Sequence, residues 1–304
     1  MWARRHGIAC GEAAPAGYNE AVNPFTAGWR RAGQLGGVPP WLATAALALL
    51  AAPLHAWAPA TQVAIARAAA NLAPPDLARQ IAKRPERFRA GVLAPFSEGA
   101  PERHYRNLQS GALDRVLMDE VKGAVAALRQ PLPFDEIVYR LGRVAHWVSD
   151  ANNPLNASGD DPDEGRYFAD YLRYAASAQP RFAPVFYAGE PAVTSEYDLK
   201  QLVLRSLHRG RDLYPLVGEE YRRVGFAPGV TAFDDRSTAF GVAAVSYSHA
   251  ISDLARVLRY VWVQGGGADP RDRLWASPPE LLVLPKGDAS GGSALRAGGG
   301  TQRR

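Results

Sequence analysis

The sequence predicts an all-α protein in which a single multi-helix domain occupies residues 57–264. Apolar residues recur at spacings of three and four over most of this range, which is the pattern of amphipathic helices. The alternation of apolar and polar residues that marks β-strands is nearly absent. The chain of 304 residues is 47% hydrophobic and 21% charged, an ordinary composition for a globular protein with a sizeable core.

The helical pattern falls into segments separated by proline-rich and glycine-rich breaks. The first segment is rich in alanine, and we interpret Pro74 and Pro75 as its stop. The last segment is apolar on most of its faces, as expected for a helix at the centre of a core. We therefore expect helices over residues 60–72, 111–129, 134–150, 164–177, 195–223 and 233–264.

Beyond residue 264 the composition changes. Gly265–Gly267 opens a segment, residues 265–304, that is rich in Gly, Pro, Ser and Arg and cannot bury enough apolar surface to fold alone. We predict a flexible tail there. Its short apolar stretch, Leu281–Leu284, could dock on the domain.

The N-terminal residues 1–56 read as an extension followed by a secretory signal peptide. The apolar run Trp41–Leu54 follows Arg30 and Arg31 and ends in a small-residue exit at Ala56. The run is too short to span a bilayer, which needs roughly 20 residues. We expect cleavage after Ala56 and export to the periplasm or the extracellular space. The alternative is an N-terminal core helix.

Charge and cysteine content limit the classes of function. The formal net charge of +5 is mildly basic, and we expect no stable binding of nucleic acid. Cys10 lies before the expected cleavage point, so the mature chain would carry no thiol. A metal site in it would use nitrogen and oxygen ligands.

The histidines after Ala56 supply candidate ligands. His146, His208 and His249 each precede an aspartate by four residues, at Asp150, Asp212 and Asp253. On a helix this spacing places both side chains on one face, where they can share a cation or form an ordinary polar pair. We interpret His208 with Asp212 as a surface pair. His249 with Asp253 is either a core pair or faces a cleft.

The first pair lies in a distinctive context. Gly142, His146 and Asp150 line one stripe of an otherwise apolar helix, which runs into Asn152-Asn153-Pro154-Leu155. Upstream stand a tryptophan at the expected mature N-terminus, Trp57, and a His-aromatic pair, His104-Tyr105. In this order the segments resemble the family that joins zinc-dependent phospholipases C to single-strand-specific zinc nucleases. The resemblance covers residues 57–264 and implies the all-α phospholipase C fold.

The resemblance also implies a ligand set. In that family a group of three zinc ions catalyses phosphodiester hydrolysis, and this chain keeps four of the implied ligands. We assign these as metal ligands, with Asp150 also as the catalytic residue: Trp57, His104, His146 and Asp150. Glu98 or Glu102 could add a carboxylate.

Several positions depart from the family pattern. Gln62 and Asn156 stand where the family has histidines, and Phe96 stands where it has an acidic residue that is a candidate general base. A later His-acid pair is replaced by Arg166 with Asp170. We keep Gln62, Asn156 and Asp170 as lesser metal candidates, and we expect one zinc, with room for two but not three.

Arg166 has two interpretations. A permanent positive charge at a former metal position excludes a cation there, yet a guanidinium can still contact a phosphate. Alternatively, Arg166 is a surface residue on a solvated helix face.

Two functions follow from the resemblance. The first is an exported, monomeric zinc-dependent phosphodiester hydrolase with a reduced metal site, acting on phospholipid, at a membrane surface, or on another phosphodiester. The second is a non-catalytic relative that binds a phosphate-bearing ligand or a protein partner through the former active-site cleft. A third possibility is that the resemblance is accidental and the protein is a structural helical protein.

Overall fold

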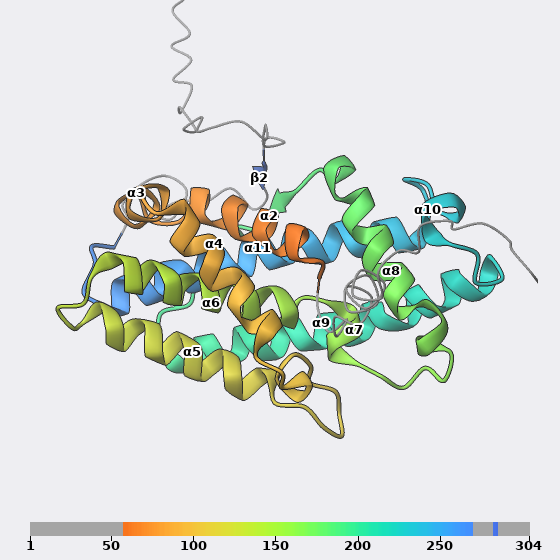
Figure 1. The fold of residues 1–304 in the computed structure, drawn as a ribbon, viewed down its shortest axis with the longest axis horizontal. Coiled ribbons are helices and arrows are strands. Elements are labelled where there is room, and N and C mark those ends of the chain that lie inside the picture. The colour runs from red at the N-terminus through yellow and green to blue at the C-terminus, as the bar shows by residue number, and fades with distance from the viewer. Residues whose placement is uncertain (1–56, 270–281, 285–304) are drawn as a thin grey trace, which may run out of the picture. The chain divides into compact units, whose positions relative to one another are not determined.

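The computed structural model describes residues 57–269 and 282–284, and within them the fold is almost entirely helical (Figure 1). The prediction of an all-α protein is therefore confirmed. The α-helices of this part are α2 (Pro59–Leu72), α3 (Pro75–Ala82), α4 (Pro85–Leu93), α5 (Leu113–Leu128), α6 (Phe134–Ala151), α7 (Pro154–Ala157), α8 (Glu164–Ala178), α9 (Glu196–Arg223), α10 (Gly229–Ala232) and α11 (Thr238–Gln264). Three short 3₁₀ turns join them, at Ala94–Ser97, Pro101–Arg103 and Gln179–Arg181.

Four helices of the described residues were not predicted from the sequence: α3, α4 and the single-turn helices α7 and α10. Pro75 and Pro85 occupy the first turns of α3 and α4, as Pro59 does in α2. Proline is favoured at this position because its missing N–H would have no partner inside the helix and its fixed φ suits helical backbone. Interpreting Pro74-Pro75 as a stop was correct for α2, but the same prolines begin the next helix.

The last helix begins later than expected. The sequence pattern suggested a start at residue 233, whereas α11 begins at Thr238. The backbone N–H of Ser237 donates to Asp234 O at 3.2 Å, which closes a turn before the helix. The Ser237 hydroxyl then accepts from the backbone N–H of Phe240 and caps the helix.

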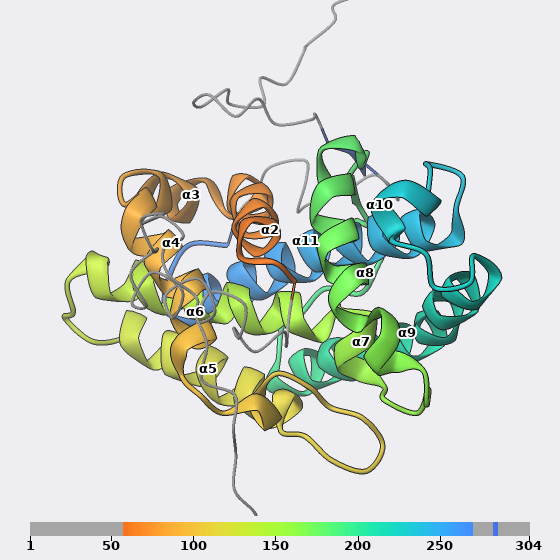
Figure 2. The same ribbon diagram turned by 45° about the vertical axis from the view of Figure 1, so that its right-hand side comes forward.

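Helix α6 lies among α2, α4, α5 and α11, at the centre of one hydrophobic core (Figures 1 and 2). It crosses α4 where two glycines meet. A Cβ on Gly142 would lie 2.2 Å from Phe88 O, and a Cβ on Gly91 would lie 2.0 Å from Tyr139 O. Only glycine permits this approach, which brings the α4 backbone beside the polar stripe of α6.

One short sheet lies outside the helices. Strands β1 (Val185–Phe186) and β2 (Leu282–Val283) pair antiparallel, and Leu284 N donates to Pro184 O at 2.9 Å. The stretch expected to dock, Leu281–Leu284, thus does so over residues 282–284. The other predictions for residues 1–56 and most of 265–304, including the signal peptide and the flexible tail, lie outside the described residues.

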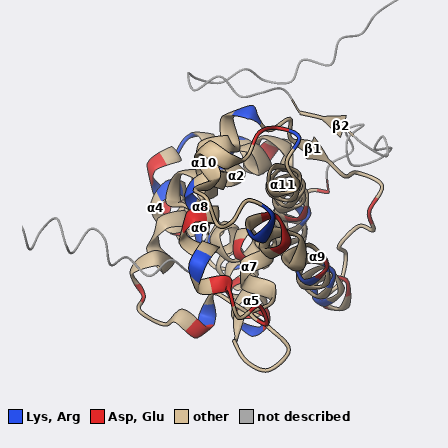
Figure 3. Cartoon of the chain, turned by 90° about the vertical axis from the view of Figure 1, so that its right-hand side faces the viewer, with Lys and Arg blue, Asp and Glu red and all other residues tan. Residues whose placement is uncertain are grey.

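Charged residues of both signs are interspersed on the same helices in the view of Figure 3, for example along α9. Among the described residues, no helix is long and apolar enough to cross a membrane.

Candidate metal centre

Helix α6 presents the first two residues of the centre one turn apart. His146 and Asp150 are both fully buried, and His146 Nε2 lies 3.2 Å from Asp150 Oδ2. The apolar residues around them on α6 are buried in the core, so the polar stripe of His146 and Asp150 is buried as well. The four-residue spacing therefore forms a pair, as predicted.

The third residue, His104, follows the 3₁₀ turn Pro101–Arg103 and is 6% exposed. Its Nδ1 lies 2.8 Å from Asp150 Oδ2 and 3.3 Å from His146 Nε2. The segment is held in place because Arg106 N donates to Asn156 O at 2.8 Å. His104, His146 and Asp150 thus form a buried group that could hold a metal ion.

Helix α4 fixes the ring of His146. The Nδ1 of His146 lies 2.8 Å from the backbone carbonyl of Val92. Since a carbonyl oxygen only accepts, Nδ1 carries the proton, and in the neutral ring the lone pair is on Nε2, which faces His104 and Asp150. Histidines that bind metals are commonly oriented by such a hydrogen bond from their other nitrogen.

Helix α2 brings Gln62 to the same carboxylate. Gln62 is fully buried, and its Nε2 donates to Asp150 Oδ1 at 2.7 Å. Its Oε1 is buried without a hydrogen-bond partner. Just before this helix, the Trp57 indole N–H donates to Ser149 O at 3.1 Å, next to Asp150 in the chain.

Asn156 also lies beside this group, but in a different role. Its Nδ2 donates to the backbone carbonyl of Asp150 at 3.2 Å. It therefore supports the end of α6.

Of the candidates from the sequence, the structure brings six to the centre or to α6 beside it: Trp57, Gln62, His104, His146, Asp150 and Asn156.

Asp150 stays ionised in this setting. Burial raises the pKa of its carboxyl, but the positive charge that His146 can carry and the hydrogen bonds from His104 and His146 outweigh burial and hold the pKa below its usual value. The hydrogen bond from His146 needs a proton on Nε2, so a cation would displace this proton and keep the ionised carboxylate as a ligand.

Aromatic rings enclose the two imidazoles. The ring centroid of Phe96 lies 4.8 Å from that of His146, edge-on, and Trp147 lies 4.8 Å from His104 and 4.9 Å from His146. The guanidinium of Arg103 lies over the Trp147 ring, 5.0 Å from the ring centroid. Phe96 supplies no carboxylate where the resemblance implies one.

The two additional carboxylates considered from the sequence lie apart from the donor atoms. Glu98 pairs with Arg143 and with Arg103, and the hydrogen bond from Arg143 lowers the pKa of Glu98 despite the opposing effect of burial. Glu102 is exposed. Neither belongs to the buried group formed by His104, His146 and Asp150.

Arg166 and Asp170 serve contacts elsewhere. Arg166 pairs with Asp163 at 3.3 Å, lies over the Phe226 ring at 3.5 Å and has a side chain that is 58% exposed. Asp170 accepts from the Tyr221 hydroxyl and from Gly229 N, each at 2.7 Å. These contacts tie α8 to the end of α9 and to α10.

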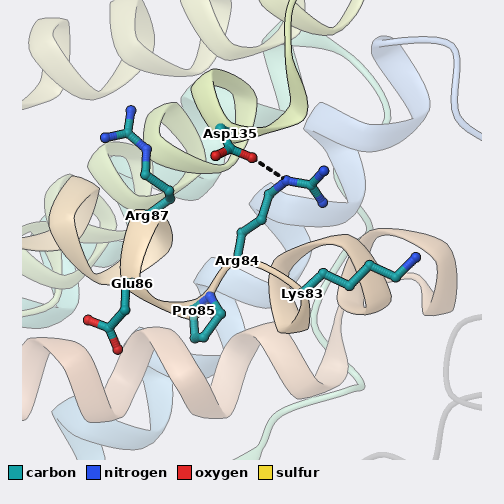
Figure 4. A pocket seen from close by; sticks show the side chains of 6 residues that line it. All are labelled: Lys83, Arg84, Pro85, Glu86, Arg87 and Asp135. Atoms are coloured by element: carbon teal, nitrogen blue, oxygen red, sulfur yellow. Dashed lines mark hydrogen bonds and ion pairs between the residues drawn. The ribbon is translucent and has the colours of Figure 1, made fainter.

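A surface pocket lies at the start of α4, at the opposite end of that helix from Val92. Figure 4 shows its lining residues: Lys83, Arg84, Pro85, Glu86, Arg87 and Asp135. Arg84 and Asp135 form an ion pair across it at 2.5 Å. This pocket shares no residue with the buried centre.

Fold and centre together define a helical protein with a buried two-histidine, one-aspartate group. Sequence reasoning missed the roles of Val92 and Gly91, since a backbone carbonyl and a packing glycine carry no motif. The chain matches no family model, no curated protein and no solved structure.

Proposed function

We propose that this protein binds one zinc ion between His104, His146 and Asp150. The donor triangle carries the proposal, with sides of 2.8, 3.2 and 3.3 Å. Donor atoms of a tetrahedral zinc site, each about 2.0–2.1 Å from the ion, lie roughly 3.3 Å from one another. Small shifts of buried side chains would therefore accommodate the ion.

Gln62 is the fourth donor in this proposal. Its Oε1 is a buried acceptor without a hydrogen-bond partner, a condition that costs about 1–3 kcal/mol. A cation beside Asp150 would give that oxygen a partner. Two imidazoles, one carboxylate and one amide oxygen form a nitrogen and oxygen set that suits zinc.

We favour a structural, non-catalytic role for this zinc ion. Structural zinc sites have four protein ligands, whereas catalytic sites keep one position open. All four proposed donor residues are buried, with His104 the most exposed at 6%. At positions where the resemblance implies a further metal, Arg166 pairs with Asp163 at the start of its own helix, and Asp170 accepts from Gly229 N of α10. The ion would then join α2, α6 and the His104 segment.

Hydrolysis of a phosphodiester is the second candidate, and the small exposure of His104 favours it. A zinc ion supplies a Lewis acid that stabilises negative charge developing on a phosphoryl oxygen. In this chain Asp150 would act as a ligand, and the His104 side would face a phospholipid or another phosphodiester. Both proposals include export of the protein after signal-peptide cleavage following Ala56.

Cobalt substitution of the purified protein tests these proposals. Bound Co²⁺ in a four-coordinate site absorbs visible light strongly, and Zn²⁺ should displace it at one equivalent per chain. A closed site predicts no spectral change with inorganic phosphate and no hydrolysis of bis(p-nitrophenyl) phosphate. Changes in both would favour the hydrolase, and no Co²⁺ band in folded protein would contradict metal binding altogether.

A further inference from the structure

A second buried polar cluster lies between α9, α11 and the segment that follows β1. Asp253 and Arg256 on α11 are 1% and 3% exposed. Arg209 reaches the cluster from α9, and Glu190 reaches it from the segment between β1 and α9. His249, which the spacing paired with Asp253, contacts Glu190 instead.

Asp253 is held tightly in this cluster. Its Oδ2 accepts from Arg209 Nη2 at 2.6 Å and from the Ser206 hydroxyl at 2.7 Å. Arg209 Nη2 also donates to Asn152 Oδ1 at 3.1 Å, which ties it to the end of α6. These contacts fix the guanidinium of Arg209 against Asp253 Oδ2, whereas Asp253 Oδ1 is buried without a hydrogen-bond partner.

Glu190 is held loosely by comparison. Its Oε1 lies 3.4 Å from His249 Nδ1 and 3.6 Å from Arg209 Nη1, and its Oε2 lies 3.6 Å from Arg256 Nη1. Glu190 Oε2, His249 Nδ1 and Arg256 Nη1 are all buried without a hydrogen-bond partner. The Glu190 side chain is 24% exposed. Three donors therefore surround a carboxylate at 3.4–3.6 Å, and none of them forms a short, well-aligned hydrogen bond with it.

The donors are also positioned in advance. The rings of His249 and Tyr187 stack with centroids 4.0 Å apart, and Arg256 donates to the Tyr187 backbone carbonyl. Buried guanidinium groups require anionic partners, and their fork of N–H donors matches the oxygens of carboxylate or phosphate. With Glu190 in place, the charges of two arginines and two acidic residues balance.

We propose that Arg209, Arg256 and His249 form a binding site for a small oxyanion, and that Glu190 occupies this site until the oxyanion displaces it. The oxyanion takes the loosely held position of Glu190, while Asp253 keeps its own hydrogen bonds. The partial exposure of Glu190 gives the ligand its entry. This site is independent of the proposed zinc centre and uses none of its donor residues.

Calorimetric titration of the purified protein with inorganic phosphate tests the site, at constant ionic strength and pH 7. Glu190→Ala should bind phosphate at least about tenfold more tightly than the wild type, because one competing charge-assisted contact is gone. Glu219→Ala removes the same charge from an exposed position of α9 and should bind as the wild type does. Arg209→Gln added to Glu190→Ala should abolish the gain.

A parallel titration with acetate identifies the preferred oxyanion. Tighter binding of phosphate indicates a phosphate ligand, and tighter binding of acetate indicates a carboxylate. Folded Glu190→Ala protein that binds neither anion better than Glu219→Ala would overturn the proposal. If Glu190→Ala does not fold, Glu190→Gln keeps the side-chain shape, and the same comparison decides.

Discussion

At the scale of single residues, the centre depends on Asp150. Gln62 engages one of its carboxylate oxygens, and His104 and His146 share the other. Any substitution at these four positions therefore changes how the buried negative charge of Asp150 is compensated.

Gln62→Glu should act in opposite directions with and without metal. In metal-free protein the new carboxylate would lie next to Asp150 Oδ1, now 2.7 Å from Gln62 Nε2. We expect a loss of stability on the order of 2–4 kcal/mol in chelator, because a buried like-charge pair replaces a hydrogen bond. With zinc the carboxylate is the stronger ligand, so zinc affinity should rise.

Thermal unfolding in chelator and in zinc measures both effects. Gln130→Glu, at an exposed position, is the control and should change little in either condition. A Gln62→Glu protein that is destabilised equally with and without zinc would show that Gln62 does not face the metal.

Residue-level prediction from the sequence succeeded where spacing carries the information. The four-residue interval of His146 and Asp150 defines a shared helix face by itself. The contact of Gln62 with Asp150 joins positions 88 residues apart, and only the packing of α2 on α6 creates it. The spacing of His249 and Asp253 predicted a pair as well, but residues on α9 and beside β1 compete for both groups.

At the scale of elements, the crossing of α4 and α6 positions Val92 for its contact with His146. Gly142→Ala would place a Cβ against Phe88 O and Val92 N and force the helices apart. We expect a loss of about 1–3 kcal/mol in unfolding free energy, together with weaker metal binding. Denaturant unfolding and metal titration measure the two effects.

Gly123→Ala provides the matched control for this substitution. A Cβ on Gly123 of α5 would have no atom within 4 Å. Alanine should therefore stabilise that helix by about 0.5–1 kcal/mol through backbone entropy alone. Similar effects of the two substitutions would contradict the close approach of α4 and α6.

Helix α9 carries a pH-dependent cap. Hydrogen bonds from Thr194 and Ser195 lower the pKa of Asp198 from 3.8 to about 2. The folded state thus binds fewer protons than the unfolded state in this range, so the contribution to stability is present above about pH 4 and is lost as pH falls toward 2.

Asp198→Ala should accordingly lower the melting temperature at pH 7, and its difference from wild type should shrink between pH 4 and pH 2. Asp212→Ala, at an exposed position of the same helix, serves as control. A difference between Asp198→Ala and wild type that stays constant over this range would refute the cap.

Element boundaries were predictable where apolar periodicity runs long. Helices α5, α6, α8 and α9 begin and end within two residues of their expected bounds. Helices α3 and α4 are short and begin with proline. Because proline can both end one helix and begin the next, it did not reveal these two helices in the sequence.

At the scale of the whole molecule, the core of the described residues contains no cysteine, so burial and polar contacts hold it together. The all-α class followed from periodicity, which is a local property. The meeting of α2, α6 and the His104 segment is a long-range property, and the resemblance to the phospholipase C family stays a prediction. An ion bound there would link segments distant in the sequence and raise stability by mass action.

The most direct test of this account is elemental analysis of the protein purified without chelator. We predict about one zinc per chain in the wild type and in His208→Ala, whose histidine is exposed, and none in His146→Ala. Folded wild-type protein that contains no metal and takes up no added zinc would contradict the central claim.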